Sequence, residues 1–340
     1  MNKTSIIGID LAKHVFQLHG LDRQGRKTLG KRLQRGELLT FLANQPPTTI
    51  VIEACGGAHY WAGQFARLGH SVRMLHPAYV KPFVRVNKND ARDAEGIALA
   101  GSQASIPDVM PKREDQLDLQ AIHRVRERLV KEKTAIGNEL RGLLNERGAL
   151  ISRGDKAVRE DLVQLLSQPD ERLSRRFREL IWSLREEWLA KVQHIADYDR
   201  ELTRMARTHE VCRRLMTIPG IGPIVSTLLY CYAGNGSTFA SGRHLSASLG
   251  LVPAQYSSGG KEVMQGISKR GNKYLRKQLI HGARAAYRSL SKDAESSRLG
   301  RWIGRMGDKH VNKVVVGLAN KLARIAWVCL AREAEYQANA

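Results

Sequence analysis

The sequence is poor in cysteine and has no long hydrophobic run. Its four cysteines, at positions 55, 212, 231 and 329, are widely spaced among 340 residues. Such spacing fits neither a zinc knuckle nor a disulfide framework, so we expect a reducing cytoplasm and assign the cysteines to core or incidental positions. No run resembles a membrane span or a secretory signal. These absences argue against a secreted disulfide-rich domain and against a membrane protein.

Acidic residues are scarce relative to basic ones. The chain has 33 Asp and Glu against 55 Lys and Arg, which gives a net charge of +22. Such an excess is typical of proteins that bind polyanions, and nucleic acid is the leading candidate. A membrane-surface protein can share this charge, but its basic residues normally line one amphipathic helix. Here they are spread along the whole chain, which favours nucleic acid.

Apolar runs near the N-terminus alternate with segments of helical periodicity. Short β-branched runs bounded by turns predict buried strands, and apolar residues at helical spacing predict the helices between them. Strands separated by helices of this length predict a mixed α/β sheet. The expected strands are 4–10, 14–19, 26–33, 49–53 and 71–75, and the expected helices are 36–45, 58–68 and 87–102.

Four carboxylates stand at positions that such a sheet would bring together. Asp10 and Glu53 each end a buried strand, and open α/β sheets bind ligands at these strand ends. Asp90 and Asp93 are three residues apart, so they share one face in the first turn of a helix. Each has a simpler explanation, because aspartates also cap turns and helix starts.

The four carboxylates together indicate a metal site. Clustered carboxylates repel one another unless a cation neutralises them, and hard oxygen ligands suit Mg²⁺ or Mn²⁺. Two such ions about 4 Å apart are the usual clamp for phosphodiester cleavage. A basic protein with an acidic metal pocket has the charges that a nuclease or strand-transfer enzyme requires.

The middle of the chain predicts an antiparallel pair of long helices, joined by a polar segment at 154–170, which could pair with another chain. Helices should fill most of the chain beyond residue 207, and 314–330 is apolar enough to be buried. We therefore divide the chain into 1–110, 111–206 and 207–340. The helical stripes are Ile122, Val125, Leu129, Ile136, Leu140 and Leu143, then Leu173, Phe177, Leu180, Leu184, Trp188, Ile195 and Leu202.

A glycine turn near residue 220 predicts a helix–hairpin–helix. Within Ile218-Pro219-Gly220-Ile221-Gly222, the two glycines would let backbone N–H groups approach a phosphate, and we expect both to tolerate substitution poorly. A plain turn between two helices would have the same pattern. Basic residues follow further on. With the two glycines we assign to nucleic-acid contact Lys269, Arg270, Lys273 and Arg276.

The motifs in order resemble a known family. Gly8-Ile9-Asp10, Ile52-Glu53-Ala54 and the Asn89-to-Ala94 helix start resemble the RuvC-like RNase H fold of Holliday-junction resolvases. The whole chain is similar to the DEDD insertion-sequence transposases of the IS110 family, which includes the pilin-gene invertases. The stretch 56–61 is closer to the IS1111 subgroup. The motifs that carry this likeness are Glu53 to Gly56, Lys88 to Ala94, Ile218 to Gly222, Gly250 to Pro253 and Tyr256 to Gly259.

The resemblance implies roles for individual residues. Asp10, Glu53, Asp90 and Asp93 would be the metal-binding acidic tetrad. Ser258 would be the nucleophile that forms a covalent phosphoserine with DNA, with the metals assisting. It also implies an assembly of several copies, in which two protomers share a site, and a bridge noncoding RNA that selects the DNA by base pairing. From the residues alone, Ser258 is one of two serines in a glycine-rich turn.

Three other functions fit parts of the sequence. Sugar kinases and related ATPases also begin with an Ile-Gly-Ile-Asp strand, but the further glycine-rich phosphate turns that they need are not found in order. A junction resolvase would use the same acids with a metal-activated water and no serine. A non-enzymatic nucleic-acid binder would need none of the acids, and all four are present.

Overall fold

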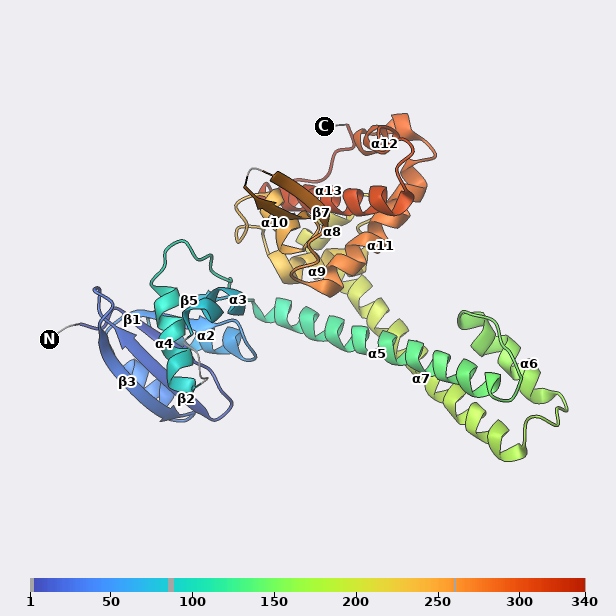
Figure 1. Ribbon diagram of the computed structural model, residues 1–340, viewed down its shortest axis with the longest axis horizontal. Coiled ribbons are helices and arrows are strands. Elements are labelled where there is room, and N and C mark those ends of the chain that lie inside the picture. The colour runs from blue at the N-terminus through green and yellow to red at the C-terminus, as the bar shows by residue number, and fades with distance from the viewer. Residues whose placement is uncertain (1–2, 85–88, 260, 340) are drawn as a thin grey trace. The chain divides into compact units, whose positions relative to one another are not determined.

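The computed structural model describes residues 3–84, 89–259 and 261–339, with the backbone alone at Ser258. The chain divides into two compact units, Met1–Arg113 and Glu114–Ala340, drawn in Figure 1. Asn87 and Lys88 of the expected helix start, and Gly260 of the serine turn, lie outside the described residues.

A five-stranded mixed sheet forms the centre of the first unit. Its strand order is β3-β2-β1-β4-β5, in which β2 is antiparallel to β1 and β3, and β4 and β5 run parallel to β1. This confirms the mixed α/β sheet expected from the sequence. The strands are β1 (Ile6–Asp10), β2 (Val15–Leu21), β3 (Lys27–Gln34), β4 (Thr49–Glu53) and β5 (Ser71–Leu75).

Helices cover both faces of the sheet. The face that includes Ile9 and Ile52, both fully buried, packs against α1 (Leu38–Ala43) and α2 (Ala58–Arg67). Burial of each isoleucine contributes about 1.5–3 kcal/mol. The opposite face packs against α4 (Asp90–Gly101), which follows the short helices α3 (Pro77–Val80) and η1 (Lys81–Phe83). Because side chains alternate along a strand, Gly8, Asp10, Val51 and Glu53 belong to the α4 face.

Small residues let α4 lie close against the sheet. Ala94, Ala98 and Ala100 are fully buried. A Cβ atom at Gly8 would lie 2.5 Å from both the carbonyl oxygen of Ala94 and the backbone nitrogen of Ala98. A Cβ at Gly101 would lie 2.3 Å from the side chain of Val51. Glycine is therefore required on both elements, and the helix backbone rests almost directly on β1 and β4.

The second unit begins with two long packed helices, α5 (Glu114–Asn145) and α7 (Arg175–Thr208) (Figure 1). At 32 residues, α5 is about 48 Å long. At one end of the pair, Leu140 of α5 packs with Trp188 of α7, and at the other Leu119 packs with Leu202. The two long helices expected from the periodicity are thus present, although Leu180 of the expected stripe is 48% exposed.

The polar segment expected at 154–170 joins the two long helices, and it also forms two short helices that the sequence analysis did not predict. It contains η2 (Ala157–Asp161) and α6 (Leu162–Ser167), and Val158 and Leu162 are buried against the long helices. The stretch carries enough scattered apolar residues to close the end of the helix pair, which a low average hydropathy concealed.

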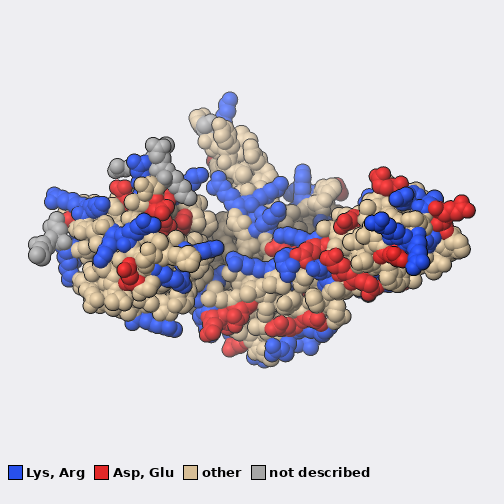
Figure 2. All heavy atoms as spheres, turned by 90° about the horizontal axis from the view of Figure 1, so that it is seen from below, with Lys and Arg blue, Asp and Glu red and all other residues tan. Residues whose placement is uncertain are grey.

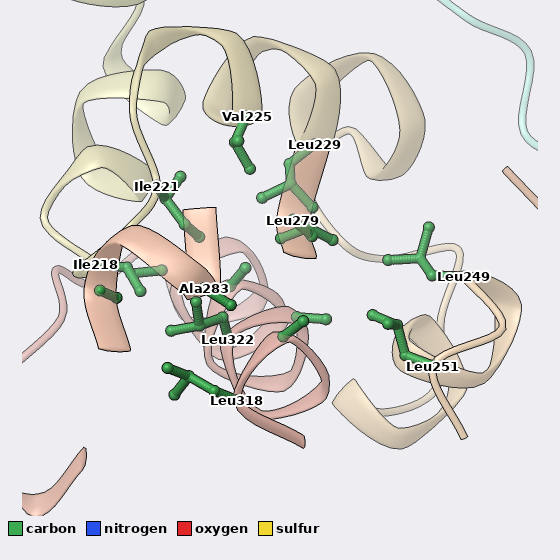
Figure 3. Packing of buried hydrophobic residues seen from close by; sticks show 14 of the residues in the cluster. Ile218, Ile221, Val225, Leu229, Leu249, Leu251, Leu279, Ala283, Leu318 and Leu322 are labelled. Atoms are coloured by element: carbon green, nitrogen blue, oxygen red, sulfur yellow. The ribbon is translucent and has the colours of Figure 1, made fainter. Parts of the chain in front are cut away.

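The rest of the chain is mainly helical and shares one core. Figure 3 shows Ile218 and Ile221 from the glycine turn beside Ala283, with Leu318 and Leu322 below them. A hairpin of two strands, not foreseen in the sequence, interrupts the helices. The elements are α8 (Glu210–Met216), α9 (Pro223–Ala233), α10 (Gly242–Ser248), β6 (Pro253–Ser258), β7 (Lys261–Ile267), α11 (Lys273–Leu290), η3 (Ala294–Ser296), α12 (Arg298–Gly304) and α13 (Val311–Ala331).

The helix α13 corrects the statement that no run resembles a membrane span. It is long and apolar enough to cross a bilayer. However, Val315, Leu318, Leu322 and Ala326 on it are fully buried within the common core. A central core helix has the same composition as a membrane span, and the expectation that 314–330 would be buried is confirmed.

We predict that Gly220→Val destabilises the protein by about 3 kcal/mol. Gly220 has a φ of +82°, and a Cβ there would lie 2.4 Å from the carbonyl oxygen of Gly282 in α11. A β-branched residue would combine backbone strain with a clash against backbone. Urea unfolding followed by circular dichroism measures the loss.

The control is Gly222→Ala in the same turn. Gly222 has a φ of −92°, and nothing lies within 4 Å of an added Cβ. This corrects the expectation that both glycines are intolerant, and the alanine should cost less than about 1 kcal/mol, the loss of a glycine cap. Equal stability losses for the two variants would contradict the role given to Gly220.

Candidate functional site

Two strand ends place Asp10 and Glu53 side by side. Strand β1 pairs in parallel with β4, and Ile9 lies opposite Ile52, so the next residues on each strand are also neighbours. Both carboxylates are half-buried. The expectation that these two acids share one edge of the sheet is therefore confirmed.

The first turn of α4 adds two more carboxylates at this edge. Oxygen atoms of Asp10, Asp90 and Asp93 all lie within 4.8 Å of one another. Asp93 is half-buried and Asp90 is exposed, so the group is open to solvent on one side. Three of the four acids expected to cluster are thus brought within the reach of one cation, and we call them, with Glu53, the acidic pocket.

The simpler explanation of the aspartate pair is that an aspartate caps the helix, but Asn89 takes that position. It is the N-cap residue of α4, and its side-chain oxygen accepts a hydrogen bond from the backbone N–H of Ala91 at 3.0 Å. An asparagine therefore caps this helix, and neither Asp90 nor Asp93 occupies the N-cap position. The positive end of the helix dipole still favours two carboxylates in this turn.

Cys55 is a neighbour of the pocket that sequence reasoning assigned to the core or to incidental positions. It is half-buried, two residues beyond Glu53. Burial, followed by the negative charges of Glu53 and Asp10, raises the pKa of the Cys55 thiol, which keeps it protonated. The charges of both strand-end carboxylates therefore act on the thiol, as expected if Asp10 and Glu53 both lie near it. Its position directly after the Glu53 strand was the only signal in the sequence.

The donor set of the acidic pocket fits a hard divalent cation. Carboxylate oxygens are the ligands that Mg²⁺ and Mn²⁺ prefer, and carboxylates this close repel one another without a cation. No histidine or cysteine of the described residues joins the group. The residues that would hold an ion are Asp10, Asp90 and Asp93, with Glu53 on the neighbouring strand.

The residues assigned to nucleic-acid contact fall into two classes. Lys269, Arg270 and Lys273 are exposed, beside or in the first turn of α11. Arg276, by contrast, is only 8% exposed, and its guanidinium donates hydrogen bonds to the carbonyl oxygens of Leu249 and Arg270 at 2.9 and 2.7 Å. Arg276 therefore joins two loops of the protein interior, and we leave it out of the proposed contact surface.

The two glycines near residue 220 also differ. Gly220 faces α11, where the absence of a Cβ allows the close approach of Gly282. Gly222 is exposed at the N-terminus of α9. Only Gly222 therefore lies where its helix start is open to a phosphate.

The hairpin of β6 and β7 carries Ser258. Ser258 is the last residue of β6 and pairs with Lys261 of β7, and Gly259 follows it with a φ of +56°. The neighbouring Ser257 hydroxyl accepts a hydrogen bond from the Gln255 side chain at 2.9 Å. Tyr256 is 71% exposed, so the hairpin projects an aromatic side chain into solvent.

Comparison with known proteins points to one family. Residues 7–147 match a family model described as "Transposase", for the DEDD class, and residues 212–298 match one described as "Transposase IS116/IS110/IS902 family". The chain is 40% identical to the transposase for insertion sequence element IS1111A of Coxiella burnetii, over 100% of this chain and 93% of that protein.

Two other relatives extend this similarity. The transposase for insertion sequence element IS1328 of Yersinia enterocolitica is 41% identical over 96% of this chain and 97% of that protein. The pilin gene-inverting protein of Moraxella lacunata is 25% identical over 97% of this chain and 96% of that protein. The likeness therefore covers both units.

We predict that Gly8→Ala weakens binding of Mn²⁺ by about tenfold. The added Cβ would meet the backbone of α4 at 2.5 Å, so the helix must move away from β1 and carry Asp90 and Asp93 away from Asp10. Isothermal titration of Mn²⁺ into the full chain measures the change. Gly36→Ala is the control, because nothing lies within 4 Å of a Cβ there. Unchanged Mn²⁺ affinity in Gly8→Ala would show that metal binding does not depend on the close approach of α4 to β1.

Proposed function

Because the chain belongs to the IS110/IS116 family of insertion-sequence transposases, we propose that it cuts and rejoins DNA at the acidic pocket with a divalent cation, Mg²⁺ or Mn²⁺. The observation that carries this proposal is the convergence of Asp10, Asp90 and Asp93 oxygens within 4.8 Å. A transposase acts on the DNA of its host, so we place its work in the cytoplasm, at the nucleoid.

The topology of the first unit supports a RuvC-like RNase H fold. Strand β2 is antiparallel to β1 and β3, strands β4 and β5 run parallel to β1, and the order is β3-β2-β1-β4-β5. Acids end β1 and β4, and further acids begin the helix laid across them. We infer that the acidic pocket is the catalytic centre of such a fold, because ligands bind at these strand ends.

The pocket residues would position a divalent ion, and a bound ion would stabilise negative charge on the scissile phosphate. We propose that Ser258 is the nucleophile. Its Oγ–P bond forms as the bond from phosphorus to a deoxyribose oxygen breaks, and the hydroxyl proton passes to a base or to solvent. Rejoining reverses the step, when a deoxyribose hydroxyl attacks the phosphoserine. No external energy source is needed, since one phosphodiester replaces another.

The charge of the remaining surface suits nucleic-acid binding. Figure 2 shows Lys and Arg side chains spread over the visible face rather than confined to one element. We propose that Lys269, Arg270 and Lys273, with the exposed helix start at Gly222, contact phosphates. The turn at 217–222 would then act as a helix–hairpin–helix.

Two further features of the proposal come from the family resemblance. A bridge noncoding RNA would select donor and target DNA by base pairing, and a net charge of +22 suits binding both RNA and DNA. The chain would work as a homo-oligomer, with the α5–α7 pair, the 111–206 part of our three-part division, as its assembly arm. Exposed Leu180 and Trp182 on α7 are consistent with such contacts.

A metal-dependent junction resolvase is the second candidate. The acidic pocket alone would support hydrolysis by a metal-activated water. In that case the glycine turn with Ser258 would have no chemical role, and cleavage would leave no covalent protein–DNA link.

We predict that Asp10→Asn reduces DNA cleavage by at least about 1,000-fold, because a neutral amide weakens ion binding and several kcal/mol of charge stabilisation depend on that ion. Binding of DNA should change less than about twofold. Cleavage of labelled DNA and fluorescence anisotropy measure the two quantities. Asp118→Asn, at an exposed carboxylate of α5, is the control and should leave both unchanged. If Asp10→Asn also loses DNA binding, Asp10 has a structural role rather than a catalytic one.

We predict that Ser258→Ala abolishes the covalent protein–DNA adduct. The adduct is detected as labelled DNA that migrates with the protein after denaturation. Ser257→Ala removes the neighbouring hydroxyl and should keep the adduct. Cleavage without any adduct in the unsubstituted protein would favour the resolvase, and an adduct that survives in Ser258→Ala would contradict the assignment.

A further inference from the structure

A cavity of about 460 Å³ opens beside α12 and α13, away in sequence from the acidic pocket and from the Ser258 hairpin. Four of its six lining side chains are cationic and none is acidic. The volume falls in the range of small-molecule sites, but such sites are lined mainly by apolar groups. The lining residues are Arg298, Arg301, Trp302, Arg305, Lys321 and Asn339.

Two of the cations in this cavity, Arg301 and Lys321, are held by uncharged groups of the protein. The Arg301 guanidinium donates a hydrogen bond to the carbonyl oxygen of Glu295 at 3.0 Å, and the Lys321 ammonium lies 5.2 Å from the centre of the Trp302 ring. Among the residues that the structure describes, no carboxylate pairs with Arg301, Arg305 or Lys321. The carbonyl orients Arg301 and the indole orients Lys321, and neither group carries a full negative charge.

Like charges gathered in this way raise the free energy of the unliganded protein. Burial, followed by the positive charges of Arg324 and Arg298, lowers the pKa of Lys321. Each cause acts against the ammonium form, and a bound anion would act in its favour. The cavity is therefore complementary to negative charge.

The walls of the cavity belong to a rigid framework. Leu299 and Ile303 anchor α12 in the same core as Leu318 and Leu322 of α13. A Cβ at Gly317 would lie 3.3 Å from the Trp302 ring, so the absence of a side chain there lets the indole lie against α13. Arg301 and Lys321, held on two helices that share one core, lose little conformational entropy when they bind a ligand.

We propose that this cavity binds the phosphodiester backbone of nucleic acid. None of the residues of this phosphate site belongs to the acidic pocket or to the β6–β7 hairpin that carries Ser258. Arginine forks suit phosphate oxygens, and an ammonium adds a point charge. The inference rests on the proposed function only in taking nucleic acid as the ligand. DNA and RNA offer the same phosphodiester chemistry.

The test is the salt dependence of binding in the double variant Arg305→Gln with Lys321→Gln. Fluorescence anisotropy gives the affinity for a duplex DNA and for a single-stranded RNA at several salt concentrations. Loss of two phosphate contacts should reduce the slope of log K against log salt by about 1.8 for duplex DNA or about 1.4 for single-stranded RNA. The nucleic acid whose slope falls is the one that occupies the cavity.

The matched control is Arg153→Gln with Arg176→Gln. It removes two exposed cations outside the cavity, one in the loop before η2 and one on α7, and should leave both slopes unchanged. If the cavity variant is less stable than the control in urea, Arg305→Gln alone should give half the change, because Arg305 is exposed.

Unchanged slopes for both nucleic acids in the cavity variants would overturn the proposal, as would an equal fall in the control. Cleavage by the cavity variants at saturating DNA keeps this outcome separate from the proposed function. If cleavage still depends on Asp10 while both slopes are unchanged, only the phosphate site fails.

Discussion

The close contact between α4 and β1 at Gly8 is the constraint on which the acidic pocket depends. Without a Cβ at this position, the backbone of α4 reaches the strand two residues before Asp10. Buried alanines on the helix complete the fit. The helix therefore begins at the edge where β1 and β4 end, and its first turn delivers two aspartates to the strand-end carboxylates. Dense packing on one face of the sheet thus fixes the chemistry at its edge.

The distribution of charge over the rest of the molecule suits a protein that binds both a cation and a polyanion. In a chain with a net charge of +22, three of the 33 acidic residues come together where they would bind a cation, and four cations line a cavity elsewhere, where they would bind phosphates. The two arrangements are complementary, because the substrate is a polyanion whose cleavage needs a cation. Membership of a transposase family agrees with both.

Much of the first unit was predictable, because its signals are local. β4 and β5 match the expected bounds, and Asp10, Asp90 and Asp93 converge as expected. The buried Arg276, the small helices at 157–167 and the β6–β7 hairpin were not predictable in the same way. Arg276 lies in a run of lysines and arginines, and only long-range contacts with two carbonyls distinguish it from its exposed neighbours. The cavity at Trp302 likewise depends on how α12 packs against α13, which no local sequence pattern shows.

Anomalous diffraction from crystals of the full chain grown with Mn²⁺ tests the central claim most directly. We expect a manganese peak bonded to oxygens of Asp10, Asp90 and Asp93, on the side of the pocket that faces Glu53. Manganese bound only at other sites, while these carboxylates pair with lysines or arginines of the same chain, would contradict it.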